Sequence, residues 1–412
     1  MIIHKGHRFR LSLSEEQKTL CARTAGICRW LWNLALEQRT LAWQNGRHSV
    51  GFAAQCAELP GLKDAAPWLR EAPSHCLQQV LRDLDQAFQN FFAGRTAYPV
   101  YRKKFQNDSF RFPDPKQFEV NEAGRWIKLP KFRRVAMFNG RGRHALKLAG
   151  QAKSITVRRE GKRWYAAVLC AWEGPEPKPN HGPAVGLDLG VVQTITLSAG
   201  EVLAIQGRTR AEERRLARLQ RSLGRKRKGS RNRAKARARL AELQIRIARR
   251  RRDAIHKATT KLAKNHGLIV IEDLRVKAMT ASARGTLEAP GTNVSAKAGL
   301  NRAMLNVAFG EIRRQLEYKC GWYGSTLLAA NPVHTSRRCS QCGHTDAGNR
   351  RSQATFHCLS CGHGANADVN AARNILERGT AEGTPAAVCG AMPSGGRRSR
   401  NPAARAIRIP SF

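Results

Sequence analysis

Two stretches near the start of the chain carry apolar residues at helical spacing. The first opens at Ser14, an N-cap residue followed by Gln17, and continues through Trp30. The second follows Pro73, with Ser74 as its expected N-cap. The buried stripe expected for this second stretch is Leu77, Val80, Leu81, Leu84, Phe88 and Phe92. Both patterns predict amphipathic helices whose aromatic side chains belong to a core.

Shorter runs that alternate with period two surround these helices. Residues 9–13 predict a strand before the first helix, and residues 109–171 contain several more runs separated by glycine and charged turns. We therefore expect a small antiparallel barrel or sheet in this part of the chain. A proline-rich segment at 174–179 predicts a linker that ends it.

A different order of elements follows the linker. Three apolar runs at 184–189, 194–198 and 202–206 predict three strands in quick succession, and a further strand is predicted at 268–271 after a long helical region. Three strands, then helices, then further strands is the order of an RNase H-like α/β core. In such a core the active site uses carboxylates from strand ends and from a late helix.

The charge of the chain limits the class of its partners. The 412 residues include 73 Lys and Arg against 30 Asp and Glu, which gives a formal net charge of +43. A field of this sign and size favours polyanions, so nucleic acid is the expected partner. Because 42% of the residues are hydrophobic, the chain can also bury cores, and its length suggests two to four domains.

The region at 208–252 is the most basic part, with 20 Lys and Arg and 3 acidic residues. A break at 224–232 predicts a helical hairpin. Its expected apolar stripe is Leu216, Leu219, Leu223, Leu240, Leu243 and Ile247. A charged hairpin is often only a solvated face, but charge of one sign repels itself without a polyanion, which favours phosphate binding. The expected contacts are at Arg225, Lys226, Arg227 and Lys228.

Two Cys-x-x-Cys knuckles lie late in the chain. Cys339 and Cys342 form the first, and fifteen residues later Cys358 and Cys361 form the second. Four thiolates at this spacing can surround one tetrahedral ion, so we predict a structural zinc ribbon that binds one Zn²⁺.

The other cysteines show no paired framework, which fits a reducing compartment. The first residues lack the apolar region of a signal peptide, and no stretch approaches the roughly 20 apolar residues of a membrane span. We expect a cytoplasmic protein, associated with the nucleoid when bound to DNA, with no membrane partner.

Three scattered carboxylates could form a second metal site. Asp188 ends one predicted strand, Glu272 ends another, and Asp368 follows the second cysteine knuckle. A single acid at such a place is usually a turn residue or a helix cap. Together, however, they offer the hard oxygen ligands with which a phosphodiester nuclease holds two Mg²⁺ or Mn²⁺ ions about 3.5–4 Å apart. Gly186 and Gly190 beside Asp188 would admit a nucleic-acid backbone, or would only form turns.

Four motifs in order carry a family resemblance. Gly186-Leu187-Asp188-Leu189-Gly190, Ile271-Glu272-Asp273-Leu274, the stretch from Thr335 to His344 and the stretch from Cys358 to Ile375 resemble the RuvC-like nuclease motifs and zinc ribbon of the TnpB family. This family is transposon-encoded and related to type V CRISPR effectors. The helices of the N-terminal half also resemble the family's recognition lobe, so the resemblance covers residues 1–378.

The resemblance implies an RNA-guided DNA endonuclease of a transposable element. Its partners would be a guide RNA from the transposon end and double-stranded target DNA beside a short adjacent motif, and one RuvC-like centre would cut. By motif, Asp188, Glu272 and Asp368 would bind Mg²⁺ or Mn²⁺. Gln78 falls at a position that reads the adjacent motif. Ser74 replaces a longer polar or basic residue of the family, so the sequence of that motif does not carry over.

The resemblance also implies a multidomain α+β fold, in which a helical recognition lobe is inserted in a small wedge-like β-barrel and a RuvC-like core contains an inserted zinc ribbon. The expected boundaries are 1–13 for the first barrel strand, 14–107 for the recognition domain, 108–180 for the rest of the barrel, 181–334 for the nuclease core, 335–365 for the zinc ribbon, 366–378 for the last core segment and 379–412 for a disordered tail.

Two other functions fit parts of the sequence. One is an RNA-guided DNA-binding repressor with a dead nuclease site, and the intact acid triplet argues against it. The other is an unguided RuvC-like resolvase or transposase accessory. The large N-terminal helical and barrel portions argue against that function, because a junction resolvase does not need them. The high positive charge argues against it as well, because it suits a protein that encloses a guide RNA and its heteroduplex.

Overall fold

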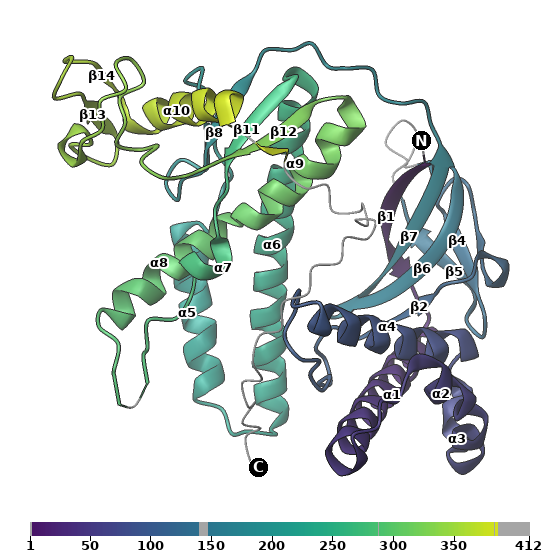
Figure 1. Cartoon of the computed structure of the whole chain (residues 1–412). Helices are drawn as coiled ribbons and strands as arrows, with labels where there is room; N and C mark the ends of the chain where they lie inside the picture. Colours follow the sequence, from purple (N-terminus) through teal and green to yellow (C-terminus); the bar gives the residue numbers. More distant parts are fainter. Residues whose placement is uncertain (1, 140–146, 287, 383, 386–412) are drawn as a thin grey trace. The chain divides into compact units, whose positions relative to one another are not determined.

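The computed structural model describes residues 2–139, 147–286, 288–382 and 384–385 (Figure 1). The chain divides into two compact units. The first contains Met1–Glu176 and Arg214–Arg246, and the second contains Pro177–Glu213 and Ile247–Phe412. The boundary crosses both helices of the basic hairpin.

The first unit begins with one long strand, continues with helices and returns to strands. The helices are α1 (Glu15–Gly46), α2 (Phe52–Ala57), α3 (Leu59–Ala65), the 3₁₀ helix η1 (Pro67–Glu71), α4 (Ser74–Phe92) and a short 3₁₀ turn η2 (Pro115–Gln117). The strands are β1 (Ile2–Ser12), β2 (Ser109–Phe112), β3 (Glu119–Val120), β4 (Trp126–Leu129), β5 (Arg133–Phe138), β6 (Gln151–Glu160) and β7 (Arg163–Glu173).

The starts of the two long helices test the N-cap predictions. Helix α1 opens at Ser14, as predicted, and the structure adds that Ser14 and Gln17 form a capping box. The N-cap of α4 is Pro73, however, and the hydroxyl of Ser74 instead accepts a hydrogen bond from Lys63 Nζ at 2.9 Å. The predicted stripe of α4 is buried except at Phe92, which is 78% exposed because α4 ends there and its last turn projects beyond the core.

The strands of the first unit form one seven-stranded antiparallel sheet in the order β2-β6-β7-β1-β5-β4-β3. The predicted barrel is therefore wrong, because among the described residues the edge strands β2 and β3 pair only with β6 and β4. A two-residue edge strand such as β3 offers too few backbone groups to close a sheet. β1 lies at the centre of the sheet although the helices follow it in sequence, and helices and sheet share one core.

The second unit contains a six-stranded sheet, several helices and the cysteine knuckles. The strands are β8 (Val185–Asp188), β9 (Ile195–Leu197), β10 (Val202–Leu203), β11 (Leu268–Glu272), β12 (Thr326–Ala330), β13 (Thr355–His357), β14 (Gly364–Asn366) and β15 (Thr384–Pro385). The helices are α5 (Arg210–Gly224) and α6 (Arg231–Asn265), both of which cross the unit boundary, α7 (Val276–Met279), α8 (Val294–Val307), α9 (Phe309–Tyr323), the 3₁₀ turn η4 (Ala347–Asn349) and α10 (Ala367–Glu382). The four strands predicted here are confirmed, with ends that differ by at most three residues.

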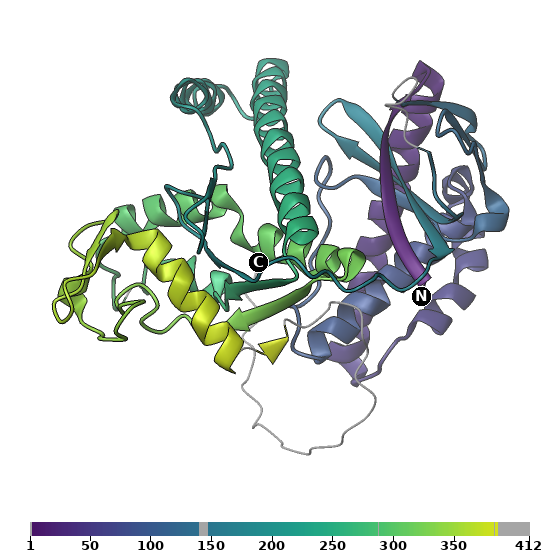
Figure 2. The same ribbon diagram turned by 90° about the horizontal axis from the view of Figure 1, so that it is seen from above.

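The large sheet of this unit has the order β10-β9-β8-β11-β12-β15, and β8, β11 and β12 run parallel. Helix α10 lies across one face, as Figure 2 shows. On the other face Ile269 and Ile271 share a core with Leu262 of α6 and Leu316 of α9. Val270 points to the α10 face and packs with Ile375. Burial on both faces explains why β11 is apolar at consecutive positions.

The predicted tail begins too early. Residues 379–382 continue α10, and β15 pairs antiparallel with β12. The remaining residues of the predicted disordered tail, 386–412, lie outside the described residues.

Within the described part of the chain, no helix has the length and apolarity that a membrane crossing requires.

Candidate metal centre and nucleic-acid interface

Asp188 and Glu272 lie side by side at the carboxyl ends of two adjacent parallel strands. Leu187 of β8 pairs with Ile271 of β11, so the next residue of each strand is a carboxylate. Side chains alternate between the faces of a strand. Since Leu187 and Ile271 point to the α6 and α9 face, Asp188 and Glu272 point to the opposite face, where α10 lies.

Asp368 reaches the same face from the first turn of α10. The side-chain oxygen of Asn366 accepts hydrogen bonds from the backbone N–H groups of Asp368 at 3.0 Å and Val369 at 3.2 Å, and so starts the helix. The partial positive charge of a helix N-terminus favours a carboxylate there. Asp368 is only 8% exposed. The fold thus brings together three acids that lie far apart in the sequence.

The three carboxylates share a negatively charged site, in which Asp368 is buried and Asp188 and Glu272 are half-buried. Burial raises the pKa of Asp188 to about 7, and the negative charges of Glu272 and Asp368 add to the shift while Arg350 opposes it. Burial also raises the pKa of Glu272, although the Thr335 hydroxyl donates a 2.6 Å hydrogen bond to its carboxylate. Three carboxylates carry more negative charge than the Arg350 guanidinium beside Asp368 neutralises, and this excess fits a bound cation. Oxygen donors alone fit Mg²⁺ or Mn²⁺.

Two residues of this site were not predicted. Arg350 donates a hydrogen bond from Nη2 to Asp368 Oδ1 at 3.1 Å and a second to the backbone oxygen of Gln353. No spacing in the sequence distinguishes Arg350 from the other cations between the knuckles. Thr335 lies within one of the family-like motifs, but its hydrogen bond to Glu272 could not be predicted without the fold.

Gly186 has a different role from the one that its place beside Asp188 suggested. A Cβ atom there would overlap the backbone oxygen of Ala372 and lie 2.8 Å from Leu376 Cβ, both in α10. Gly186 therefore admits a helix and not a nucleic-acid backbone. A Cβ on Gly190 would lie 2.5 Å from the backbone oxygen of Gln193, so Gly190 serves a turn, the second of the two readings.

We expect Gly186→Ala to displace α10 from β8 and with it Asp368. Overpacking at such a contact typically costs about 1–3 kcal/mol, so the melting temperature should fall by several degrees and cleavage should fall with it. Gly310→Ala is the matched control. A Cβ there meets no atom within 4 Å, so this helical substitution should be neutral or slightly stabilising in the same melting experiment.

The four predicted zinc ligands meet as expected. Cys339 Sγ lies 3.7 Å from Cys361 Sγ, and Cys342 Sγ lies 3.6 Å from Cys358 Sγ. Sulfur atoms bound tetrahedrally at about 2.3 Å to zinc would have similar separations. The two knuckles repeat one backbone turn, in which Gly343 and Gly362 adopt φ values of +78° and +72° and donate to the oxygens of Cys339 and Cys358. The geometry and donor atoms fit one structural Zn²⁺.

Asn349 connects both knuckles to each other and to the residue that contacts Asp368. This asparagine is fully buried, and its amide donates to the backbone oxygens of Arg337 and His344. Its side-chain oxygen accepts from the N–H of Leu359, in the second knuckle. Arg350 is the next residue. The conformation of the two knuckles therefore helps to determine where the Arg350 guanidinium lies.

Helix α10 holds the start of this cysteine-containing segment. Asn370 donates to the oxygen of Arg338 and accepts from the N–H of Ser340, while Asn374 donates to the oxygens of Thr335 and Arg338. The guanidinium of Arg338 also forms two 2.8 Å hydrogen bonds with Glu377. One helix thus carries a carboxylate of the acidic site and anchors the segment that contains the cysteine knuckles.

The predicted basic hairpin is confirmed as two helices, α5 and α6, joined by a turn. Arg233 closes the turn by donating to the backbone oxygens of Leu223 and Lys226. At the base, Arg250 pairs with Glu212, and this pairing lowers the pKa of the glutamate to about 2. Leu216, Leu243 and Ile247 of the predicted stripe are buried, and the other three positions are half-buried.

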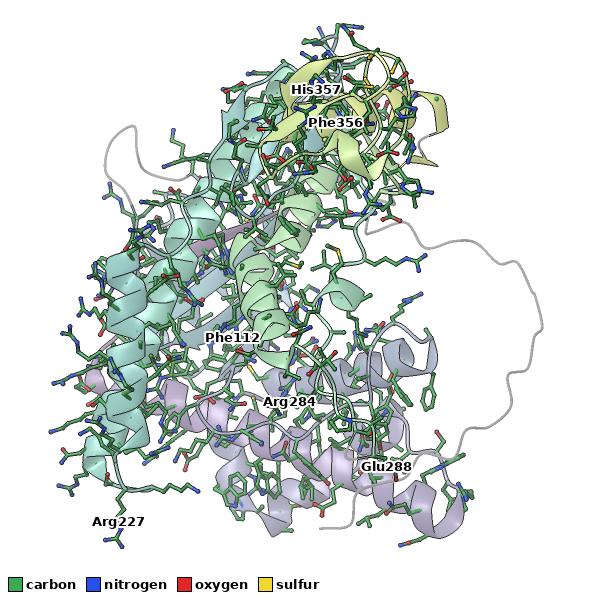
Figure 3. All side chains as sticks on the ribbon, turned by 90° about the vertical axis from the view of Figure 1, so that its left-hand side faces the viewer. Phe112, Arg227, Arg284, Glu288, Phe356 and His357 are labelled. Carbon is green, nitrogen blue, oxygen red and sulfur yellow. The ribbon has the colours of Figure 1, made fainter. Side chains whose placement is uncertain are left out.

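Most of the predicted nucleic-acid contacts are exposed. Arg225, Arg227 and Lys228 are exposed in the turn and Lys226 is half-buried. Figure 3 shows the side chain of Arg227 pointing away from the hairpin tip. Gln78 lies on the exposed side of α4, in contrast to the buried Gln79, whose amide bonds Asp83.

Three family descriptions match parts of the chain. "Probable transposase" matches residues 167–283, "Cas12f1-like, TNB domain" matches residues 309–375, and "Helix-turn-helix domain" matches residues 1–48. The second match spans the cysteine knuckles and Asp368. The third covers β1 and α1, which form a strand and a single helix in this chain.

Relatives match along almost the whole chain. A protein of Escherichia coli K12 named "Putative RNA-guided DNA endonuclease InsQ" is 41% identical over 392 residues, or 95% of each chain. A Streptomyces pristinaespiralis protein of the same description is 33% identical over 94% of this chain and 91% of its own. Among solved structures, Cas12f1 in complex with a single guide RNA and target DNA matches 91% of this chain and 99% of its own, with a TM-score of 0.55 and 14% identity. That similarity concerns the fold alone.

Proposed function

The chain belongs to the TnpB family, and we propose on that premise that it is a transposon-associated RNA-guided DNA endonuclease that cuts at the site of Asp188, Glu272 and Asp368. The observation that supports this most directly is the convergence of the three acids on one face of the sheet, in a chain matched over 95% of its length by a relative named as such an enzyme. Cleavage of a plasmid by the purified protein with its copurified RNA tests it. A plasmid with the matched target should be cut, and one with a scrambled target should stay intact.

In this proposal the three carboxylates hold divalent cations, Mg²⁺ or Mn²⁺. Bound ions of this type would activate water and stabilise the leaving oxygen of a phosphodiester. Thr335 orients the Glu272 carboxylate through its hydroxyl, and Arg350 holds Asp368 through its guanidinium. The zinc ribbon would bind one Zn²⁺ as a structural ion and would keep Arg350 in place.

The proposed domains follow the expected boundaries, with two changes. Residues 14–107 form the helical recognition domain, and 1–13 with 108–180 form a wedge-like domain that is an open sheet and not a barrel. Residues 181–334 and 366–385 form an RNase H-like core of the RuvC type, because β8, β9 and β10 followed by β11 and β12 have its strand order. Residues 335–365 form the zinc ribbon.

The alternative of an RNA-guided repressor without cleavage fits the site less well. A repressor gains nothing from three acids gathered at one site, where burial and the negative charges of Glu272 and Asp368 raise the pKa of Asp188. An unguided resolvase would leave the large first unit without a function. The guide RNA and double-stranded target DNA remain the partners that the net charge of +43 favours.

The basic hairpin is proposed to contact the guide RNA or its heteroduplex. Charge reversal at Arg225, Lys226, Arg227 and Lys228 to Glu should weaken binding and flatten its salt dependence. Each lost phosphate contact should reduce the slope of log affinity against log salt by about 0.7–0.9. Filter binding across a salt series measures this slope.

The matched control for the hairpin exchanges Arg225 and Arg227 for Lys, which preserves the charge and should preserve the slope. Melting temperature should barely move in either variant, since Leu216 and Leu243 lie outside the turn. An unchanged affinity and slope in the charge-reversal variant would show that the hairpin is only a solvated face.

A further inference from the structure

Phe92, the exposed residue of the predicted apolar stripe of α4, lies beside other aromatic residues. It lies at the end of α4 with a half-buried Phe91, a buried Phe88 and the half-exposed Tyr98 of the following loop. The ring centroids of Phe91 lie 5.3 Å from those of both Phe92 and Tyr98. We call Phe88, Phe91, Phe92 and Tyr98 the aromatic cluster.

The exposed rings of the aromatic cluster pack on the buried Phe88, and Tyr98 also contacts α1. Phe88 is only 8% exposed and contacts both Phe92 and Tyr98, with ring centroids 6.1 and 5.5 Å away. The Tyr98 hydroxyl lies 3.0 Å from the hydroxyl of Thr40 in α1. Packing against Phe88 and the contact with Thr40 therefore hold the rings of Phe92 and Tyr98 in place.

The loop that carries Tyr98 is held against α1 by side-chain hydrogen bonds. Trp32 donates from its indole N–H to the oxygen of Val100, and Asn33 exchanges two hydrogen bonds with the backbone of Arg102. The Arg102 guanidinium stacks 3.6 Å above the Trp32 ring. Such a pre-ordered loop loses little further conformational entropy on binding a partner.

Charge around the aromatic cluster selects the class of partner. The segment 93–105 contains Arg95, Arg102, Lys103 and Lys104 and no acidic residue. Of the nearby acids, Asp85 is paired with Arg39 and Asp83 accepts a hydrogen bond from Gln79, while the negative charge of Glu37 in α1 acts on Tyr101. Exposed rings interleaved with cations suit a polyanion that has flat apolar faces, which describes a nucleic-acid strand with unpaired bases.

We propose that the aromatic cluster is a stacking platform for unpaired bases of a bound strand, with Arg95, Lys103 and Lys104 next to its phosphates. Paired bases hide their faces inside the duplex, so a platform of this kind selects single-stranded segments. Every base has such a face, so binding here does not depend on sequence. The inference rests on the proposed function only in that the partner is a nucleic acid, and it assigns a second site apart from the acidic one.

The test compares substitutions that keep or remove the rings. Phe92→Leu with Tyr98→Leu keeps the apolar character and removes the rings, whereas Phe92→Tyr with Tyr98→Phe keeps them. The full-length chain, stripped of nucleic acid at high salt, is titrated with labelled oligo(dT), oligo(rU) and a DNA duplex, each of about 16 nucleotides or base pairs. No divalent metal is added, so the measurement does not depend on cleavage.

The leucine variant should bind at least one single strand about ten-fold more weakly or worse, because stacking contributes about 1–3 kcal/mol per base. Duplex binding and the salt slope should stay unchanged, and the ring-keeping variant should bind like the original chain. The oligo(dT) and oligo(rU) arms tell whether the site serves DNA or RNA. Equal losses on single strand and duplex would overturn the proposal, as would unchanged strand binding with an altered oligomeric state, which would assign the cluster to a protein interface.

Discussion

Replacing any one of Asp188, Glu272 or Asp368 by Ala is expected to reduce cleavage of guide-matched DNA by about a thousand-fold or more, with RNA-guided DNA binding retained. Each substitution removes an oxygen ligand of the proposed ions, which contribute several kcal/mol to the stabilisation of the transition state. None of the three is a positive charge, so contacts with phosphates are not lost. A plasmid cleavage assay measures the first effect, and a gel-shift assay with the same RNA and target measures the second.

Asp273 provides the matched control for this experiment. It follows Glu272 directly but is exposed and paired with Arg313 at 2.5 Å. Asp273→Ala should cut within about two-fold of the original chain, since exposed ion pairs contribute little. If any two of the three variants still cut DNA, the assignment of the nuclease site is wrong. If a variant loses both target binding and cleavage, the substitution has damaged the structure.

The raised pKa of Asp188 predicts how the same site responds to pH. Its carboxyl is protonated more readily in the folded chain, with a pKa of about 7, than at its ordinary value of 3.8. Without a divalent ion, stability is therefore lost as the pH rises through about 7, because the site must then hold another negative charge. Asp188→Asn should raise the melting temperature at pH 8 without metal. It should also remove most of the stabilisation that Mg²⁺ gives the original chain at that pH.

Cys339→Ser or Cys361→Ser is expected to remove both the bound zinc and the order of residues 335–365. A structural zinc ion contributes folding free energy directly, and the hydrophobic core at this segment consists of Cys339, Phe356, Cys358 and Ala367 of α10, two of which are proposed zinc ligands. Metal analysis should show zinc falling from about one ion per chain toward none. Limited proteolysis should cut between β12 and α10, and cleavage of DNA should fall because Arg350 loses its support from Asn349.

Cys56→Ser is the control for the cysteine substitutions. Cys56 is a half-buried residue of α2 in the first unit, remote in sequence from the knuckles. This variant should keep its zinc and its nuclease activity. A folded Cys339→Ser protein with a full complement of zinc would contradict the four-cysteine site.

Much of the secondary structure was predictable because local rules decided it. The capping box at Ser14 and Gln17 starts α1 whatever lies around it. The apolar run at 268–271 favours a strand because Ile269, Val270 and Ile271 are all β-branched. The cysteine spacing likewise predicted that the four thiols meet, since the two knuckles close locally and each repeats the same turn.

The predictions that were wrong concern features that contacts between distant parts of the chain determine. Nothing local distinguishes Phe92 from Phe88, and only the end of α4 relative to its core leaves one ring exposed and the other buried. The barrel prediction failed because strand alternation specifies faces and not closure, which depends on the lengths of the edge strands. Gly186 looked like part of a binding surface until α10, nearly two hundred residues later, occupied the space above it.

The sequence alone determined which residues could bind metal. Carboxylates at strand ends and paired cysteines are chemical facts of the chain, and the family resemblance named the same residues. Only the tertiary structure decided that Asp188 and Glu272 share a face, through the parallel register of β8 and β11, and that Arg350 and Thr335 belong to their site. The physical reason is that register and helix packing are set by cores assembled from the whole chain, whereas ligand chemistry and local turns are properties of a few neighbouring residues.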